Sequence, residues 1–167
     1  MINRELSRFS LVFIGAFFLL SWAYNQTNDT QIQYFIIDFG TVEPSAWLIN
    51  NLPFLPHVTA EGNKLSSPAG ALAIQHGCEG VEAMLVLIAA FIAVKISLQR
   101  RLVGMVLCVA LLYVLNQLRI VLLFASAIHS EPLFDALHGF VSPVVMIMSG
   151  GAFFYFWTQR YQYSDAQ

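Results

Sequence analysis

Residues 102–128 read LVGMVLCVALLYVLNQLRIVLLFASAI, an apolar run interrupted by a single charged side chain, that of Arg119. The hydrocarbon core of a bilayer is about 30 Å thick and is crossed by ~20 apolar residues in a helix. This run is longer than that minimum, so it predicts a membrane-spanning helix that tilts or extends past the interface. An ordinary soluble fold is excluded at this point.

The rest of the chain has the same character. Hydrophobic residues make up 57% of its 167 residues and charged residues only 11%, whereas a soluble domain carries about 25% charged residues. The net charge of −2 gives no basic surface for nucleic acid. We therefore expect an all-α polytopic membrane protein that forms a single transmembrane domain over residues 1–167. Its four expected spans are residues 9–24, 79–96, 102–128 and 138–158.

Basic residues predict how these spans are oriented. Cytoplasmic loops are enriched in lysine and arginine, and six of the eight basic residues lie at the ends of spans that can share one side. Both termini are then cytoplasmic, and the first span is expected to be an uncleaved helix because no A-x-A site follows it. The six residues are Arg4, Arg8, Lys95, Arg100, Arg101 and Arg160.

The segment of residues 25–77 is the expected extracytoplasmic part, and it should cover the outer ends of the spans. Residues 38–41, Asp-Phe-Gly-Thr, have the composition of a turn. Residues 44–55 are apolar with Trp47 and Phe54, which is typical of a short interfacial helix. Residues 61–64, Glu-Gly-Asn-Lys, lie between two short extended stretches and predict a β-hairpin.

A thiol stands where this segment meets the second span, in the run His76-Gly77-Cys78-Glu79-Gly80-Val81-Glu82. A cysteine is a nucleophile only as a thiolate, which a helix N-terminus or a nearby cation favours. The alternative is that Cys78 is a small packing residue. Cys108 is different, since it lies in the middle of an apolar helix at another depth, and we expect it to be a core residue that forms no disulfide with Cys78.

The predicted topology brings two more reactive residues to the depth of Cys78. Arg119 lies about 26 Å along the third span from its inner end, and Asn116 shares its helix face. His138 opens the fourth span, and Asp135, three residues earlier, is placed to orient its imidazole for acid–base work. The alternatives are an arginine that snorkels to the headgroups and an ordinary interfacial histidine.

The remaining polar residues near this level have plainer expected roles. Glu82 should lie on the same helix face as Cys78 and pair with Arg119, because an unpaired carboxylate in the membrane is costly. Glu79 should be solvated. A metal site is the alternative role for the histidines, but no tight Cys-x-x-Cys or His-x-x-x-His pair supports one, so neither a metal nor a cofactor is expected. The alternative metal site would consist of His76, Cys78, His129 and His138. Without a metal, the histidines that are expected in loops or at the interface are His57, His76 and His129.

Six residues in a fixed order carry a resemblance to a known family: Cys78-x-Gly80, Glu82, Asn116-x-x-Arg119 and His138. This pattern resembles the exosortase/archaeosortase family of polytopic membrane cysteine transpeptidases, over most of the chain after about residue 48. The chain looks like a compact member, and exosortase H is the subgroup that we expect. Glu79 departs from the family pattern, in which a small or hydroxyl residue is expected.

The resemblance implies a reaction and a role for each matching residue. Cys78 would attack a peptide bond in the C-terminal sorting signal of a secreted protein and form an acyl-enzyme. Arg119 would stabilise the oxyanion or the thiolate, and His138 would act as general acid or base. From their spacing and charge, Glu82, Asn116 and Asp135 are expected in supporting positions. The implied partners are sorting-signal segments, membrane lipids and a lipid- or glycan-linked acceptor, at the periplasmic face of a bacterial inner membrane. The alternative function is a non-catalytic membrane subunit of an envelope-assembly system, in which the polar residues only join helices.

Overall fold

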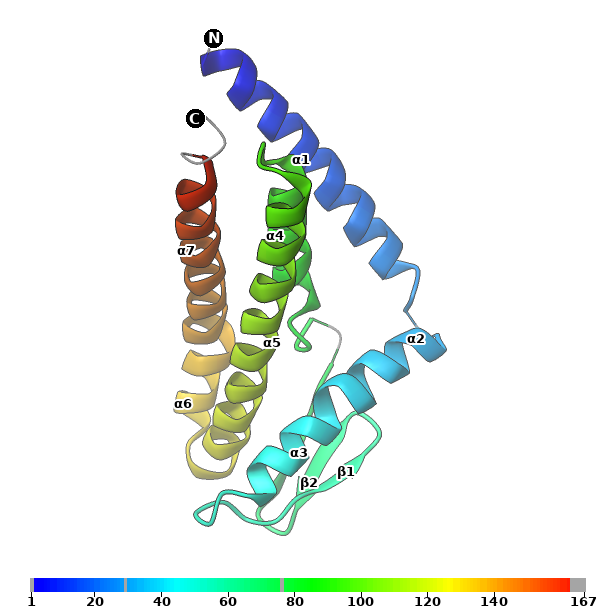
Figure 1. Ribbon diagram of the computed structural model, residues 1–167. Helices are drawn as coiled ribbons and strands as arrows, with labels where there is room; N and C mark the ends of the chain where they lie inside the picture. The colour runs from blue at the N-terminus through cyan, green and yellow to red at the C-terminus, as the bar shows by residue number, and fades with distance from the viewer. Residues whose placement is uncertain (1, 29, 76, 163–167) are drawn as a thin grey trace. The chain divides into compact units, whose positions relative to one another are not determined.

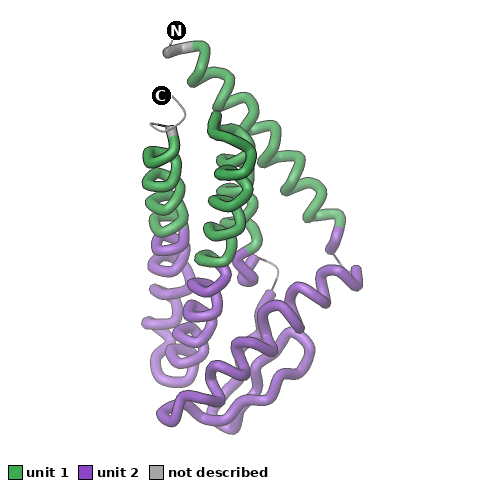
Figure 2. The backbone as a smooth tube through the Cα atoms, viewed as in Figure 1, with its two compact units in different colours: residues 1–26, 81–112, 147–167 green, residues 27–80, 113–146 purple. Residues whose placement is uncertain are grey.

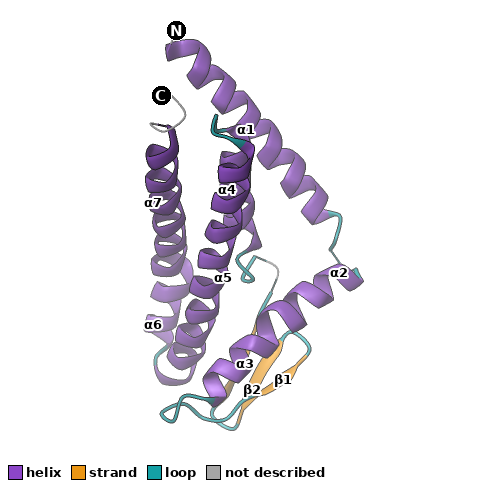
Figure 3. Ribbon diagram, in the orientation of Figure 1, coloured by secondary structure: helices purple, strands orange, loops and turns teal. Residues whose placement is uncertain are grey.

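The computed structural model describes residues 2–28, 30–75 and 77–162, and these are mostly helical (Figures 1 and 3). The chain forms two compact units, each assembled from separate segments of sequence (Figure 2). Unit 1 comprises residues 1–26, 81–112 and 147–167, and unit 2 comprises residues 27–80 and 113–146. Each unit is described by itself below.

Unit 1 is built from helices that the sequence predicts as membrane spans. It contains α1 (Ile2–Asn25), α4 (Val81–Ala93), the first part of α5 (Leu98–His129) and most of α7 (Ser142–Gln162). α1 packs along α4, and polar contacts at one end of this pair fix their alignment. Arg8 Nη2 donates to the Ala93 carbonyl oxygen at 3.4 Å, and Lys95 forms an ion pair with Glu5.

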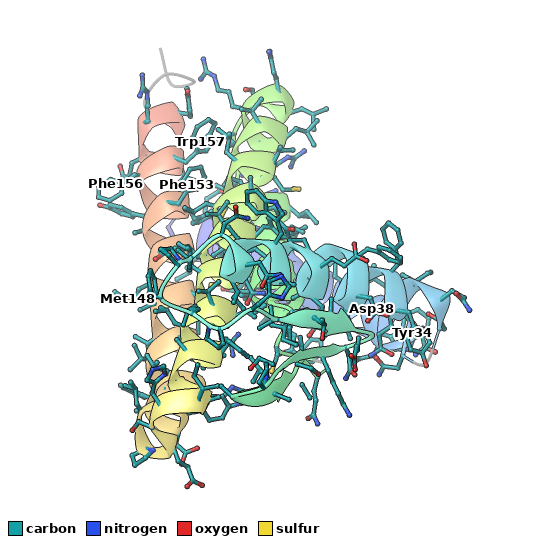
Figure 4. All side chains as sticks on the ribbon, turned by 90° about the horizontal axis from the view of Figure 1, so that it is seen from below. Tyr34, Asp38, Met148, Phe153, Phe156 and Trp157 are labelled. Atoms are coloured by element: carbon teal, nitrogen blue, oxygen red, sulfur yellow. The ribbon has the colours of Figure 1, made fainter. Side chains whose placement is uncertain are left out.

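Small residues bring α5 close to α4 and α7 inside unit 1. A Cβ built on Gly104 would lie 2.3 Å from Trp157 Nε1 and 2.8 Å from Phe91, so only glycine fits at this crossing. The Trp157 indole N–H donates to the Arg100 carbonyl oxygen at 3.0 Å. Figure 4 shows Trp157 and Phe153 on the side of α7 that faces α5, with Phe156 on the opposite side.

Three of the described helical stretches are long and apolar enough to cross a membrane, namely Arg4–Asn25, Leu98–His129 and Glu131–Tyr161. They contain the first, third and fourth expected spans. The second expected span, residues 79–96, corresponds to α4, which is apolar but has only 13 helical residues. These helices agree with the predicted mostly helical membrane fold, while the count of four spans stays a prediction.

Unit 2 begins with a continuous helical stretch composed of α2 (Gln31–Tyr34), η1 (Phe35–Val42) and α3 (Glu43–Asn50). The predicted turn at residues 38–41 is therefore wrong, because these residues lie within η1, a π-helix. The wider π turn places Ile37 and Val42, five residues apart, on one buried face. The Thr41 hydroxyl donates to the Ile36 carbonyl oxygen at 3.0 Å. Burial of the apolar face outweighs the local preference of Asp and Gly for a turn.

The other face of this stretch is exposed and aromatic, with Phe35, Phe39 and Trp47 each more than half exposed. Tyr34, labelled in Figure 4, is also exposed, whereas Asp38 one turn later is only partly exposed and its Oδ1 is buried. The predicted helix within residues 44–55 is confirmed by α3, which ends at Asn50. Its position at a lipid interface stays a prediction.

The expected hairpin is confirmed and belongs to a small sheet. β1 (Thr59–Glu61) pairs antiparallel with β2 (Lys64–Ser67), and β2 pairs antiparallel with β3 (Gly70–Ala73). Gly62 takes φ +57 in the turn between β1 and β2, a conformation that glycine adopts without strain. The third strand was not predicted, since its alternation of small residues is too short to stand out.

The core of unit 2 lies where the helical stretch and the sheet meet the second part of α5. Its members come from all three elements: Ile37, Val42, Ala46, Ile49, Val58, Leu65, Ile74, Ile120, Val121 and Phe124. A buried polar bridge adds to this packing, in which the Ser45 hydroxyl donates to Gln117 Oε1 at 2.6 Å and Gln117 Nε2 donates to the Gly40 carbonyl oxygen at 3.2 Å. These contacts hold one face of α5 against the helical stretch of residues 31–50.

Basic residues divide unevenly between the units. The six that predict the topology all belong to unit 1, and unit 2 holds only Lys64 and Arg119. The orientation that the sequence predicts from these residues stays a prediction.

Candidate functional site

Cys78 lies in a tight loop that leads into α4. The Cys78 N–H donates to the Gln75 carbonyl oxygen at 2.9 Å, and the flanking Gly77 and Gly80 take φ +93 and +78. The helix begins only at Val81, so Cys78 precedes it instead of occupying its first turn. The predicted helix-face relation between Cys78 and Glu82 is therefore wrong, because Gly80 with its positive φ lies between them and the helix begins only after it.

Gly80 brings this loop against α5. A Cβ built on Gly80 would lie 2.8 Å from Asn116 Cγ and 2.9 Å from Asn116 Oδ1, so the backbone of Gly80 touches the Asn116 side chain. The two parts of the sequence motif, Cys78-x-Gly80 and Asn116-x-x-Arg119, thus meet within unit 2. Cys78 itself is half-buried and packs against the edge of the core cluster.

The α5 side of this contact carries polar groups that the described part of the chain leaves without hydrogen bonds. Asn116 is 0% exposed, and within residues 2–28, 30–75 and 77–162 neither its Oδ1 nor its Nδ2 has a partner. The buried Nε of Arg119 likewise has no hydrogen-bond partner within these described ranges. A buried polar group without a partner costs about 1–3 kcal/mol, and such groups are commonly kept for a functional reason.

Two carboxylates near Cys78 differ from their predicted surroundings. Glu79 was expected to be solvated, but it is buried, with 3% of its surface exposed, because the turn around Gly80 directs it inward. Glu82 lies in unit 1 and its side chain is exposed. Its pairing with Arg119 stays a prediction.

His138 lies in the helical stretch that leads from α6 (Glu131–Ala136) through η2 (Leu137–Val141) into α7. This stretch begins after Ser130 with proline in its first turn. The sequence did not reveal that His138 belongs to a π-helical segment, a feature that is frequent at functional sites. Its imidazole is exposed and stacks on the Phe134 ring, with centroids 5.5 Å apart and planes inclined by 5°. Asp135 is exposed, and its orienting role stays a prediction.

The structure brings the Cys78 loop and the Asn116–Arg119 face of α5 into contact through Gly80 and Asn116. All three predicted catalytic residues belong to unit 2. Among the described residues, however, no hydrogen bond or ion pair joins His138 to Cys78 or Arg119. Phe134 is the neighbour that sequence reasoning missed, although its spacing of four residues before His138 on a helix could have indicated the contact.

The other residues considered for chemistry have ordinary surroundings. Cys108 is a free cysteine with 1% of its surface exposed, in agreement with its predicted core position. His57 is exposed in a loop, and His129 Nδ1 bonds the Ala125 carbonyl oxygen at 2.8 Å at the end of α5. His76 lies outside the described residues. Within the described ranges, no three His, Cys, Asp or Glu side chains are grouped so that they could hold a metal ion.

Comparison with models of known protein families assigns the chain to one of them. A model of the transmembrane exosortase family, of the EpsH type, matches residues 4–155. The chain belongs to this family. Searches of curated proteins and of solved structures gave no match. The match covers both units of this exosortase, so the predicted family is confirmed; the subgroup exosortase H stays a prediction.

Membership gives this exosortase a membrane transpeptidase-type role in general. The family model extends from Arg4 to Tyr155 and so includes the Cys78 loop, the Asn116–Arg119 face of α5 and the η2 segment that carries His138. The chemical step and the residues that perform it are therefore the next question.

Proposed function

We propose that this exosortase is a cysteine transpeptidase or protease that cleaves C-terminal sorting signals on the extracytoplasmic side of the bacterial inner membrane. Both termini are cytoplasmic, and α4, completed by its flanking residues, is the second of four spans. The substrate is the membrane-anchored tail of a secreted protein, made of a short motif, a membrane helix and a basic cluster. The acceptor is water or an amine carried by a lipid or glycan.

In the proposed reaction the Cys78 thiolate attacks the carbonyl carbon of the scissile peptide bond. Arg119 stabilises the oxyanion of the tetrahedral intermediate, since a fixed cation in a water-poor site is most effective there. The C–N bond then breaks, and the leaving amine takes a proton from His138. The acyl group stays on sulfur as a thioester until the acceptor attacks it, and His138 then removes the acceptor's proton.

The observation that carries this proposal is the contact between Gly80 and Asn116. It joins the loop that holds Cys78 to the face of α5 that holds Arg119, and both are parts of the motif that resembles the family. The partnerless Nε of Arg119 supports a guanidinium that is kept available for a substrate. A purely structural arginine would be expected to use its donors inside the protein.

The test is a direct search for the acyl-enzyme. The exosortase is co-produced with a secreted reporter that ends in the sorting tail of a protein from the same genome, and membranes are digested and analysed by mass spectrometry. We expect the Cys78 peptide to carry the reporter's new C-terminal residues, and hydroxylamine should remove them, since it cleaves thioesters. Cleavage of the reporter with an unmodified Cys78 at every time point would reject the mechanism.

The π-helical segment around His138 provides a second test. Deleting Gly139, which has open space around its Cα, should convert η2 into regular α-helix and rotate His138 by about 100° relative to α7. We expect processing of the reporter to be lost while the protein remains inserted, measured by immunoblotting of membrane fractions. Substitution of Gly139 with alanine, which keeps the chain length, is the matched control and should retain processing.

A further inference from the structure

Two neighbouring amide side chains on α5, both buried, differ in their hydrogen bonding. Gln117 is 4% exposed, and both ends of its amide are bonded, Oε1 by Ser45 and Nε2 to the Gly40 carbonyl oxygen. Asn116 is 0% exposed and, within the described ranges, has no partner at Oδ1 or Nδ2. Burial alone therefore does not explain Asn116, since the adjacent residue shows how this fold satisfies a structural amide.

Elsewhere in unit 2 an asparagine shows what such an amide binds. Asn50 Nδ2 donates to the Val58 carbonyl oxygen at 3.0 Å, and Asn50 Oδ1 accepts from the Val58 N–H at 2.8 Å. One carboxamide thus satisfies a donor and an acceptor of extended main chain, independently of the side chain there. Asn116 offers the same pair of groups, and among the residues that the structure describes neither has a hydrogen-bond partner.

We infer that Asn116 binds the main chain of the substrate, its Nδ2 donating to a carbonyl oxygen and its Oδ1 accepting from an N–H beside the scissile bond. This inference rests on the proposed function and names the recognition group of that site. A peptide bond must leave its helix to be attacked, and in an apolar setting its freed N–H and C=O groups need new partners. Asn116 contacts Gly80, two residues from Cys78, which places its amide beside the nucleophile's loop.

An oxyanion alone would be a poorer ligand for Asn116. It would use the Nδ2 donor and leave Oδ1 without a partner, whereas a peptide group completes both. The proposed subsite therefore recognises an extended peptide backbone and is indifferent to the side chain at that position. Selectivity for the sorting motif must arise from other contacts.

The first experiment separates a substrate-binding amide from a structural one without any substrate. Unfolding midpoints of the full chain in detergent are compared for the wild type, Asn116→Leu and Gln117→Leu. Leucine branches at the same atom as asparagine and removes the partnerless groups, so Asn116→Leu should unfold at an equal or higher temperature, by up to about 3 °C. Gln117→Leu breaks two bonds and should unfold at a lower temperature. Asn116→Ala repeats the comparison should leucine not fit.

The second experiment uses peptides that span the cleavage site of the reporter. In a series of peptides, each amide near the scissile bond is replaced in turn by an ester, which deletes one N–H. With wild-type exosortase one of these esters should raise KM about tenfold. In Asn116→Leu the KM for the all-amide peptide should already be raised, and that ester should cause no further loss. Asn116→Asp keeps the acceptor and should still discriminate against the ester.

Each outcome of these experiments either supports the inference about Asn116 or overturns it. A midpoint for Asn116→Leu that falls as Gln117→Leu does would assign Asn116 a structural role and overturn it. An ester effect of equal size in the wild type and in Asn116→Leu would overturn it as well, while leaving the transpeptidase function intact. Failure of the wild-type protein to cleave the all-amide peptide would instead count against the proposed function.

Discussion

Replacing Cys78 with alanine is expected to abolish processing of the sorting-tail reporter, with a loss of about a thousandfold or more, because the proposed acyl-enzyme cannot form without the sulfur. The substitution removes one half-buried atom at the edge of the unit 2 core, so the protein should still be produced and inserted. The measurement is the ratio of cleaved to uncleaved reporter on immunoblots, in cells that produce equal amounts of exosortase.

Cys108→Ala is the matched control, since it removes the second thiol from a buried helical position. It should lower stability somewhat by opening a small cavity and leave processing in place. Continued processing by Cys78→Ala would favour the alternative function, a non-catalytic membrane subunit whose reporter is cut by another protease.

Replacing Gly80 with alanine is expected to have the second-largest effect. The φ of +78 disfavours any residue with a Cβ by about 1–2 kcal/mol, and that Cβ would lie 2.8 Å from Asn116 Cγ. The loop or the side chain must move, and either movement separates Cys78 from the Asn116–Arg119 face. We expect strong loss of processing together with a lower unfolding midpoint in detergent.

Gly77→Ala distinguishes these two causes. Gly77 flanks Cys78 on its other side and has φ +93, but nothing lies within 4 Å of its built Cβ. The Gly77 variant therefore carries the backbone strain without the displacement of Asn116. If processing falls equally in both variants, the backbone conformation of the loop explains the loss. A much larger loss in Gly80→Ala than in Gly77→Ala would show that processing requires the contact between Gly80 and Asn116.

The helices of this fold could be predicted from sequence because their signal is strong and local. Long apolar runs with basic ends predicted α1, α5 and the stretch that ends in α7. The glycine turn predicted the β1–β2 hairpin. Residues 38–41 could not be predicted as helix, because their local turn preference is overcome by burial of Ile37 and Val42 in a core assembled from distant segments. π-Helical geometry likewise has no local signature in residues 35–42 or 137–141.

The residues of the candidate site stay predictions from sequence, and the structure shows which of their contacts could be foreseen and which could not. Spacing and topology indicated Cys78, Arg119 and His138, but helical extrapolation through residues 78–82 failed where Gly80 adopts a left-handed conformation. The inward position of Glu79 follows from that same turn. A contact between Gly80 and Asn116 joins residues far apart in sequence, and one sequence offers no means to infer it.

The length of α5 bears on the depth at which the proposed site lies in a bilayer. Its 32 residues extend about 48 Å, while the hydrocarbon layer is about 30 Å thick. Asn116 and Arg119 belong to the part of the helix beyond its midpoint, and a helix longer than the bilayer core must tilt or extend past the interface on one side or the other. Under the proposed function we expect processing to depend on the acyl-chain length of the surrounding lipids, because that length sets how deep the Asn116–Arg119 face lies below the interface.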